Sequence, residues 1–230
     1  MTAVNAEMID FPANGGTVPG YLARSNFDGD APGVVVIQEW WGLNAHIKRV
    51  TDAFAGAGFV ALAPDLYRGQ VATEPDEARK LAMALEFPRA MADIQGAVDY
   101  LIAQPFVQPK QISVVGFCMG GRLAGLMALD GQNIGAVSAF YGVHELSDAD
   151  AQKLDVPLLA IYGEMDRNFS ADVIRNNQQK LEAAGKAHEV VVYPGAQHAF
   201  FNDDRPHIYN KEAADDAWKR TVDWFKKHLA

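Results

Sequence analysis

Short apolar runs alternate with helix-period segments along most of this chain, and this alternation restricts the fold more than any other feature. The runs are rich in β-branched residues and indicate buried strands at residues 34–37, 59–62, 112–115, 136–140, 157–161 and 189–193. Strands that are apolar on both faces are typical of parallel sheets covered by helices. The sequence therefore predicts an α/β fold with a mostly parallel central sheet and helices on both faces.

The remaining segments carry the signals of helices and of one hairpin. Asn44 and Ser170 are candidate N-caps for two amphipathic helices, and residues 212–229 form a third with an apolar stripe. Two extended segments, residues 4–11 and 17–23, flank an Asn-Gly-Gly turn. We expect them to form an antiparallel hairpin at the edge of the sheet.

Length and composition limit the function classes. The 230 residues suit a single domain over 1–230, and the irregular stretch 64–88 is a candidate lid or pocket wall. The formal net charge of -9 argues against nucleic acid and anionic membranes as partners. No signal peptide or membrane-spanning run is visible, which predicts a cytoplasmic protein that is a monomer or a small homo-oligomer. A single cysteine excludes an intramolecular disulfide and a CxxC site.

That cysteine, Cys118, lies where a buried strand runs directly into a helix. Gly116 and Gly120 flank it in the pattern G-x-C-x-G. The same strand–turn–helix context makes G-x-S-x-G a nucleophile elbow, in which a tight turn leaves room only for glycine at the flanking positions. The positive end of the following helix also favours a thiolate. We therefore predict that Cys118 is a nucleophile rather than a core residue.

A cysteine nucleophile needs a base, and this fold places the acid and then the histidine after it in the chain. Asp166 and His198 each follow a buried strand, in that order. We expect His198 to take the thiol proton and Asp166 to orient the imidazole. The one serious competitor is His144, which also follows a strand but precedes Asp166 and so breaks the expected order.

The loop after the strand at residues 34–37 carries two adjacent tryptophans. In this architecture the oxyanion is bound by backbone N–H groups from that loop and from the residue after the nucleophile. The expected donors are the amides of Trp40 and Met119, and Trp41 is a candidate wall of the substrate pocket.

Glu39 in the same loop needs a partner, because a carboxylate beside a buried strand is costly to desolvate. It can hydrogen-bond the Cys118 thiol, or pair with Arg122 or with Arg49. We expect a functional role for it as a perturbed carboxylate near the nucleophile.

These pieces together resemble the dienelactone hydrolases, or carboxymethylenebutenolidases, of the α/β-hydrolase superfamily. The matching segments are VVVIQEWWGLN, VALAPDLYRGQ, VVGFCMGGRLA, FYGV, YGEMD and YPGAQHAFFN. The resemblance implies an α/β-hydrolase fold, a Cys118–His198–Asp166 triad and a contact of Glu39 with the cysteine. It also implies that no metal or organic cofactor is needed, and that the substrate is a cyclic enol-lactone bearing a carboxylate.

The segments expected to bind the substrate depart from the family pattern. Where well-studied members carry a substrate-binding arginine after the catalytic histidine, this chain carries Asn202, followed by two aspartates. Arg79 stands near the position of a second arginine in the lid, and Arg68 and Arg205 are further candidates. The predicted substrate pocket comprises Trp41, Tyr141, Phe200 and Arg79.

The resulting hypothesis is a cysteine-dependent hydrolase of a small-molecule ester or lactone that acts through a thioester acyl-enzyme. The alternatives are a ligand-binding member of the same fold that has lost turnover, or a general carboxylesterase or thioesterase. The natural substrate and its pathway do not follow from the sequence.

Overall fold

The computed structural model describes residues 3–26 and 29–229. Within these residues the chain forms one eight-stranded sheet, in the order β1-β2-β4-β3-β5-β6-β7-β8. The strands are β1 (Val4–Ala13), β2 (Gly16–Ser25), β3 (Gly33–Ile37), β4 (Val60–Pro64), β5 (Ile112–Phe117), β6 (Ile134–Phe140), β7 (Leu158–Gly163) and β8 (His188–Tyr193).

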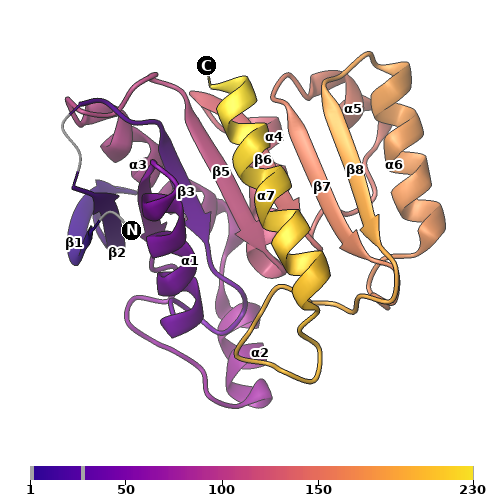
Figure 1. Ribbon diagram of the computed structural model, residues 1–230, viewed down its shortest axis with the longest axis horizontal. Coiled ribbons are helices and arrows are strands. Elements are labelled where there is room, and N and C mark those ends of the chain that lie inside the picture. Colours follow the sequence, from indigo (N-terminus) through magenta and orange to yellow (C-terminus); the bar gives the residue numbers. More distant parts are fainter. Residues whose placement is uncertain (1–2, 27–28, 230) are drawn as a thin grey trace.

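Helices cover both faces of this sheet. They are α1 (Ala45–Gly56), α2 (Pro75–Ala84), α3 (Phe87–Ala103), α4 (Met119–Asp130), α5 (Asp148–Lys153), α6 (Ala171–Ala183) and α7 (Lys211–His228). Helices α1 and α7 pack on one face, and α3 and α4 lie behind the sheet in the same view (Figure 1). None of the described helices combines the length and apolar character needed to cross a membrane.

The strands confirm the predicted sheet. From β4 to β8 every pairing is parallel, and β3 to β7 are buried along their whole length. The N-terminal hairpin is confirmed as well, because β1 pairs antiparallel with β2 at the edge of the sheet. The prediction for β8 is wrong in one respect. It is the other edge strand and only half-buried, since one of its sides has no neighbouring strand.

The predicted helix caps have the expected geometry. The Asn44 side chain accepts a hydrogen bond from the N–H of Ile47 at 3.1 Å, and the Ser170 hydroxyl accepts one from Val173 at 3.2 Å. Each bond satisfies an N–H group that has no partner inside the helix. Two helices, α3 and α5, were not predicted.

Parallel strands end at a common edge, and this edge positions the residues considered next. The arrowheads of β3, β5, β7 and β8 point to the same side of the molecule, where α2 and the segment before α7 also lie (Figure 1). In the register of the sheet Ile37 pairs with Gly116, and Phe117 pairs with Phe140. The loops that follow β3, β5 and β6 therefore begin side by side.

Candidate active site

Cys118 occupies the turn between β5 and α4 in a left-handed backbone conformation, with φ 57° and ψ −114°. Residues other than glycine rarely adopt this backbone conformation, and residues that do are concentrated at functional sites. The flanking glycines are required sterically. A Cβ on Gly116 would overlap the carbonyl group of Gly120, and a Cβ on Gly120 would lie 2.5 Å from the carbonyl oxygens of Gln38 and Ile37. The turn has the geometry expected of a nucleophile elbow.

His198 and Asp166 meet between the loops that follow β8 and β7. The His198 Nδ1–H donates to Asp166 Oδ2 at 2.7 Å, and the other carboxylate oxygen accepts the backbone N–H of Asn168 at 2.9 Å. The Asp166 side chain is fully enclosed, whereas the His198 side chain keeps 27% of its surface exposed. The pair thus combines a buried, hydrogen-bonded carboxylate with an imidazole that is partly exposed to solvent.

Asp166 and Cys118 both act on the ionisation of His198. Burial disfavours the imidazolium, but the hydrogen bond to Asp166 and the negative charges of Cys118 and Asp166 outweigh it and raise the pKa of His198 to about 10. An imidazole in this position can accept the thiol proton and hold it as a cation.

Two amides lie where an oxyanion hole is expected. Met119 is the first residue of α4, so its N–H points out of the helix start, and Trp40 lies in the turn after β3. Within the described part of the chain, neither amide donates to a protein acceptor. Both N–H groups therefore remain free to donate to another acceptor.

Glu39 has a different partner from those predicted. It is 1% exposed, and its Oε2 accepts a 2.6 Å hydrogen bond from the Asn202 side chain. Arg122 instead lies over the Phe87 ring, and Arg49 pairs with Asp203 and Asp204.

Asn202, at the position expected for a substrate-binding arginine, therefore buries its side-chain amide against Glu39. Burial raises the pKa of Glu39. The charge of His46 and the hydrogen bond from Asn202 act in the opposite direction.

The residues predicted to line the substrate pocket differ in how deeply they are buried. Tyr141 is fully buried with its ring centroid 4.9 Å from that of His198. Burial and the nearby charges of Glu39, Cys118 and Asp166 hold its pKa well above the usual value. Trp41 packs edge-on against Trp40 in a partly exposed loop. Phe200 is 0% exposed and packs in the core against Tyr141, so the prediction that it lines the substrate pocket is wrong.

Of the arginines considered, one lies near the site. Arg79 on α2 is 64% exposed and pairs with Asp76 of the same helix, so the structure does not bring it to the other predicted residues. Arg68 is held by the buried Asp93 at 2.7 Å. Arg205 lies 5.6 Å from the ring centroid of Trp41, and its charge acts on Glu39.

The sequence analysis missed Tyr67. Its hydroxyl lies 3.4 Å from the sulfur of Met119, and burial together with the charge of Cys118 raises its pKa. It follows β4 by only a few residues, so its position just beyond the carboxyl end of a buried strand was the available signal. The competitor His144 packs against Phe169 and takes no part in the Cys118–His198–Asp166 arrangement.

No cluster of His, Cys, Asp and Glu side chains suited to a metal ion occurs among the described residues. The site consists of a cysteine at a strand–turn–helix junction, a His–Asp pair and two amides without a protein acceptor among the described residues, at one edge of a mostly parallel sheet. These features define an enzyme of the α/β-hydrolase class.

The chain belongs to the dienelactone hydrolase family, whose family model matches residues 18–229. Membership of this family makes the protein a hydrolase of ester or lactone bonds.

Two relatives and one solved structure match along nearly their whole length. The chain is 38% identical to the protein usf of Aquifex pyrophilus, covering 97% of this chain and 99% of that protein. It is 35% identical to a protein of Aquifex aeolicus provisionally named a carboxymethylenebutenolidase, with the same coverage of 97% and 99%. The crystal structure of a provisionally named dienelactone hydrolase from Klebsiella pneumoniae superposes with a TM-score of 0.88 at 32% identity, covering 98% of this chain and 99% of that one.

Proposed function

We propose that this hydrolase uses Cys118 as its nucleophile and acts through a thioester acyl-enzyme. The observation that carries the proposal is the left-handed turn that holds Cys118 between β5 and α4, beside an imidazole that donates to Asp166 at 2.7 Å and whose pKa Cys118 helps to raise. A buried structural cysteine needs neither the strained turn nor an imidazole partner.

The chemistry follows from these positions. His198 takes the proton of Cys118, and the thiolate attacks the carbonyl carbon of an ester or lactone. The amides of Met119 and Trp40 stabilise the oxyanion, and collapse of the tetrahedral intermediate expels the alcohol, which His198 protonates. A water molecule that His198 deprotonates then hydrolyses the thioester and regenerates the thiol.

The test uses p-nitrophenyl acetate. Because Cys118 is the single cysteine of the chain, alkylation with iodoacetamide modifies one thiol only. We expect both alkylation and Cys118→Ala to abolish turnover, and a rapidly quenched reaction to yield enzyme carrying one acetyl group on Cys118. Turnover that survives in Cys118→Ala would refute the assignment.

We further propose that Arg205 binds a carboxylate on the substrate. Arg68 and Arg79 are each paired with an aspartate, whereas Arg205 forms no ion pair among the described residues. It lies beside Trp41, at the carboxyl edge of the sheet, in a partly buried position. The N–H of Ala72 donates to the carbonyl of Trp41 at 2.9 Å, so the segment 64–88 lies against the same loop, and we propose that it acts as a lid.

The substrate class is tested with a lactone or ester that carries a free carboxylate and with its uncharged methyl ester. Arg205→Gln is expected to lower kcat/KM for the carboxylate about 10–100-fold, the loss of one charged hydrogen bond. It should leave the methyl ester unchanged, and Arg79→Gln serves as the matched control for both. Equal losses on the two substrates would contradict a carboxylate-binding role.

A further inference from the structure

A second concave site lies between α1 and α7, on the face of the sheet that these two helices cover. It is a cavity of about 260 Å³, and the segment 201–209 contributes to its wall. Apolar side chains form much of that wall, among them Val50 and Ala53 of α1 and Ala214 of α7. Sites for small molecules have this form, because they are concave and largely apolar with a few polar groups at fixed positions.

The cavity is separate from the proposed catalytic residues. Phe201 lies in its wall, and the Phe201 ring stacks on the ring of Phe117 with the two centroids 5.2 Å apart. Phe117 is the last residue of β5 and directly precedes Cys118. Packed aromatic rings therefore lie between the cavity and the turn that holds the nucleophile.

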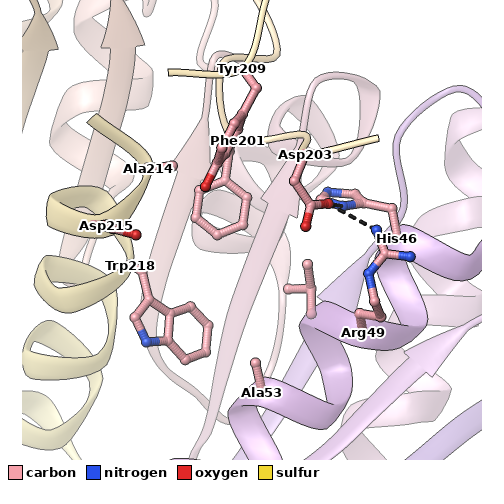
Figure 2. Close-up of a pocket in the computed structure, with 10 residues that line it drawn as sticks. His46, Arg49, Ala53, Phe201, Asp203, Tyr209, Ala214, Asp215 and Trp218 are labelled. Atoms are coloured by element: carbon pink, nitrogen blue, oxygen red, sulfur yellow. Dashed lines mark hydrogen bonds and ion pairs between the residues drawn. The ribbon is translucent and has the colours of Figure 1, made fainter. Parts of the chain in front are cut away.

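Two carboxylates at the cavity each keep an unused oxygen. Asp203 and Asp215 lie on opposite sides of it (Figure 2). His46 and Arg49 both bind Oδ1 of Asp203, at 3.0 and 2.8 Å, so its Oδ2 has no hydrogen-bond partner among the described residues. Asp215 accepts Lys211 through Oδ2, and its Oδ1 has no such partner in the described chain. Both oxygens can accept a donor from a ligand.

The donors beside these carboxylates are already used. Arg49 donates to Asp203 at 2.8 Å and to Asp204 at 2.6 Å. Because a carboxylate only accepts, His46 donates its Nδ1–H to Asp203. The His46 side chain is 3% exposed, and its Nε2 has no partner within the residues described. The charged groups with capacity left are therefore carboxylates, which favours a cationic ligand over an anionic one.

Aromatic rings complete the cavity. Trp218 of α7 and Tyr209 line it together with Phe201 (Figure 2). In the described part of the chain no lysine or arginine lies over the Trp218 ring. Aromatic faces attract cations, tryptophan most strongly, and ammonium ligands are bound in this way. Asp215 precedes Trp218 by three residues, so the two side chains are neighbours on one face of α7.

We propose that this cavity binds a small organic cation, an ammonium group carried on an aromatic or alicyclic body. The ammonium group lies over Trp218 and donates to Asp215, while Asp203 adds negative charge from the opposite side. The apolar body packs against Phe201 and Val50. This site is distinct from the active site, and the inference does not depend on the cysteine mechanism.

The experiment titrates the protein with phenethylammonium chloride and follows the indole N–H signal of Trp218 by ¹⁵N NMR. The signal is assigned by its absence in Trp218→Phe. The matched probes are 2-phenylethanol and 3-phenylpropionate, which share the phenethyl group but are neutral and anionic. We expect phenethylammonium to shift the Trp218 signal and to bind at least about 10-fold more tightly than either probe, the effect of one charged hydrogen bond.

Asp215→Asn should weaken the binding of phenethylammonium about 10-fold or more, because it removes the charge beside Trp218. The side chain is 63% exposed, so we expect this variant to fold. The matched control is Asp223→Asn. Asp223 also pairs with a lysine four residues earlier on α7, but it does not line the cavity, so the affinity should stay within about twofold.

Equal affinities for the three probes, or tighter binding of 3-phenylpropionate, would overturn the proposal. Native affinity in Asp215→Asn would overturn it as well, and so would a Trp218 signal that phenethylammonium does not move. Alkylation of Cys118 with iodoacetamide should leave the titration unchanged. If alkylation abolished binding instead, the probe would occupy the active site and the assignment to this cavity would be wrong.

Discussion

Replacing Asp166 with asparagine tests the proposed mechanism most sharply, because the structure predicts which proton becomes misplaced. One carboxylate oxygen accepts the N–H of Asn168 at 2.9 Å, and the other accepts His198 Nδ1–H at 2.7 Å. A primary amide has only one oxygen. If that oxygen stays on the Asn168 N–H, the NH₂ group faces Nδ1 of His198, which must then accept a hydrogen bond. The imidazole carries its proton on Nε2, the nitrogen that has to receive the proton of Cys118.

The misplaced proton should change both kcat/KM and the pKa of His198. In a Ser-His-Asp triad the same change lowers kcat about 10⁴-fold through the wrong tautomer, so we expect kcat/KM of Asp166→Asn to fall about 10³–10⁴-fold, or roughly 4–5 kcal/mol. The pKa of His198 should also fall. Burial already opposes the imidazolium, and the bond to Asp166 is the largest contribution that raises the pKa to about 10. Its loss should therefore lower that pKa by about two units or more.

Esterase kinetics and ¹⁵N NMR of the histidine rings measure both effects. The matched control is Glu164→Gln, the same chemical change two residues earlier, at a carboxylate that accepts the Gly195 N–H at 2.9 Å and does not contact His198. The control should keep kcat/KM and the His198 titration within about twofold of the native enzyme. An Asp166→Asn enzyme that retains kcat/KM within about tenfold, with His198 still titrating near its native pKa, would refute the assignment of the triad.

Two further predictions concern stability. Gly116→Ala places a Cβ against the Gly120 carbonyl and should lower Tm by at least about 6 °C. In the control Gly125→Ala the nearest neighbour outside the helix is 3.6 Å from the new Cβ, so Tm should stay unchanged or rise. Equal effects of the two substitutions in thermal melts would show that the turn tolerates a side chain. Because the folded pKa of His198 is about 10 and the unfolded value is about 6.5, its charge stabilises the fold fully below about pH 6.5, and this stabilisation is lost as the pH rises toward about 10. Between about pH 7 and pH 10 the native enzyme should lose about 2–4 kcal/mol more unfolding free energy in urea than His198→Gln, and parallel curves for the two proteins would contradict the raised pKa.

The relative positions of Cys118, Asp166 and His198 were predictable because residues that follow different strands of a parallel sheet all lie at the same edge of that sheet. Each residue follows a strand that is recognisable from its apolar run, and parallel strands end at one edge. The requirement for glycine beside Cys118 was predictable for a similar reason, since a strand that enters a helix without a loop leaves no space for side chains.

The partner of Glu39 was not predictable in the same way. It depends on how the irregular segment 199–210 folds back over α1, and no periodicity fixes that path. The sequence indicated that a buried carboxylate needs a partner and offered Cys118, Arg122 and Arg49. It could not single out Asn202, because that choice depends on where the loop lies. The edge position of β8 was equally hidden, because its apolar residues are the same as those of a central strand. The helix α5 was detectable, since Ser147 and Asp150 form a capping box at its start.

The asparagine at position 202 changes the electrostatics of the whole site. A neutral amide satisfies one oxygen of the buried Glu39 carboxylate but contributes no charge, so the compensating cations must come from elsewhere. One such cation is Arg205, which lies three residues beyond Asn202 on the same loop and whose charge lowers the pKa of Glu39. An arginine at position 202 would be bound to Glu39 before any substrate arrived. With Asn202 in that position, Glu39 is satisfied without consuming a guanidinium, and Arg205 is left available beside Trp41 for an anionic substrate. Asn202→Arg should therefore place a guanidinium against the Glu39 carboxylate and lower the pKa of Glu39, which ¹³C NMR of protein labelled in its glutamate carboxyl groups would detect.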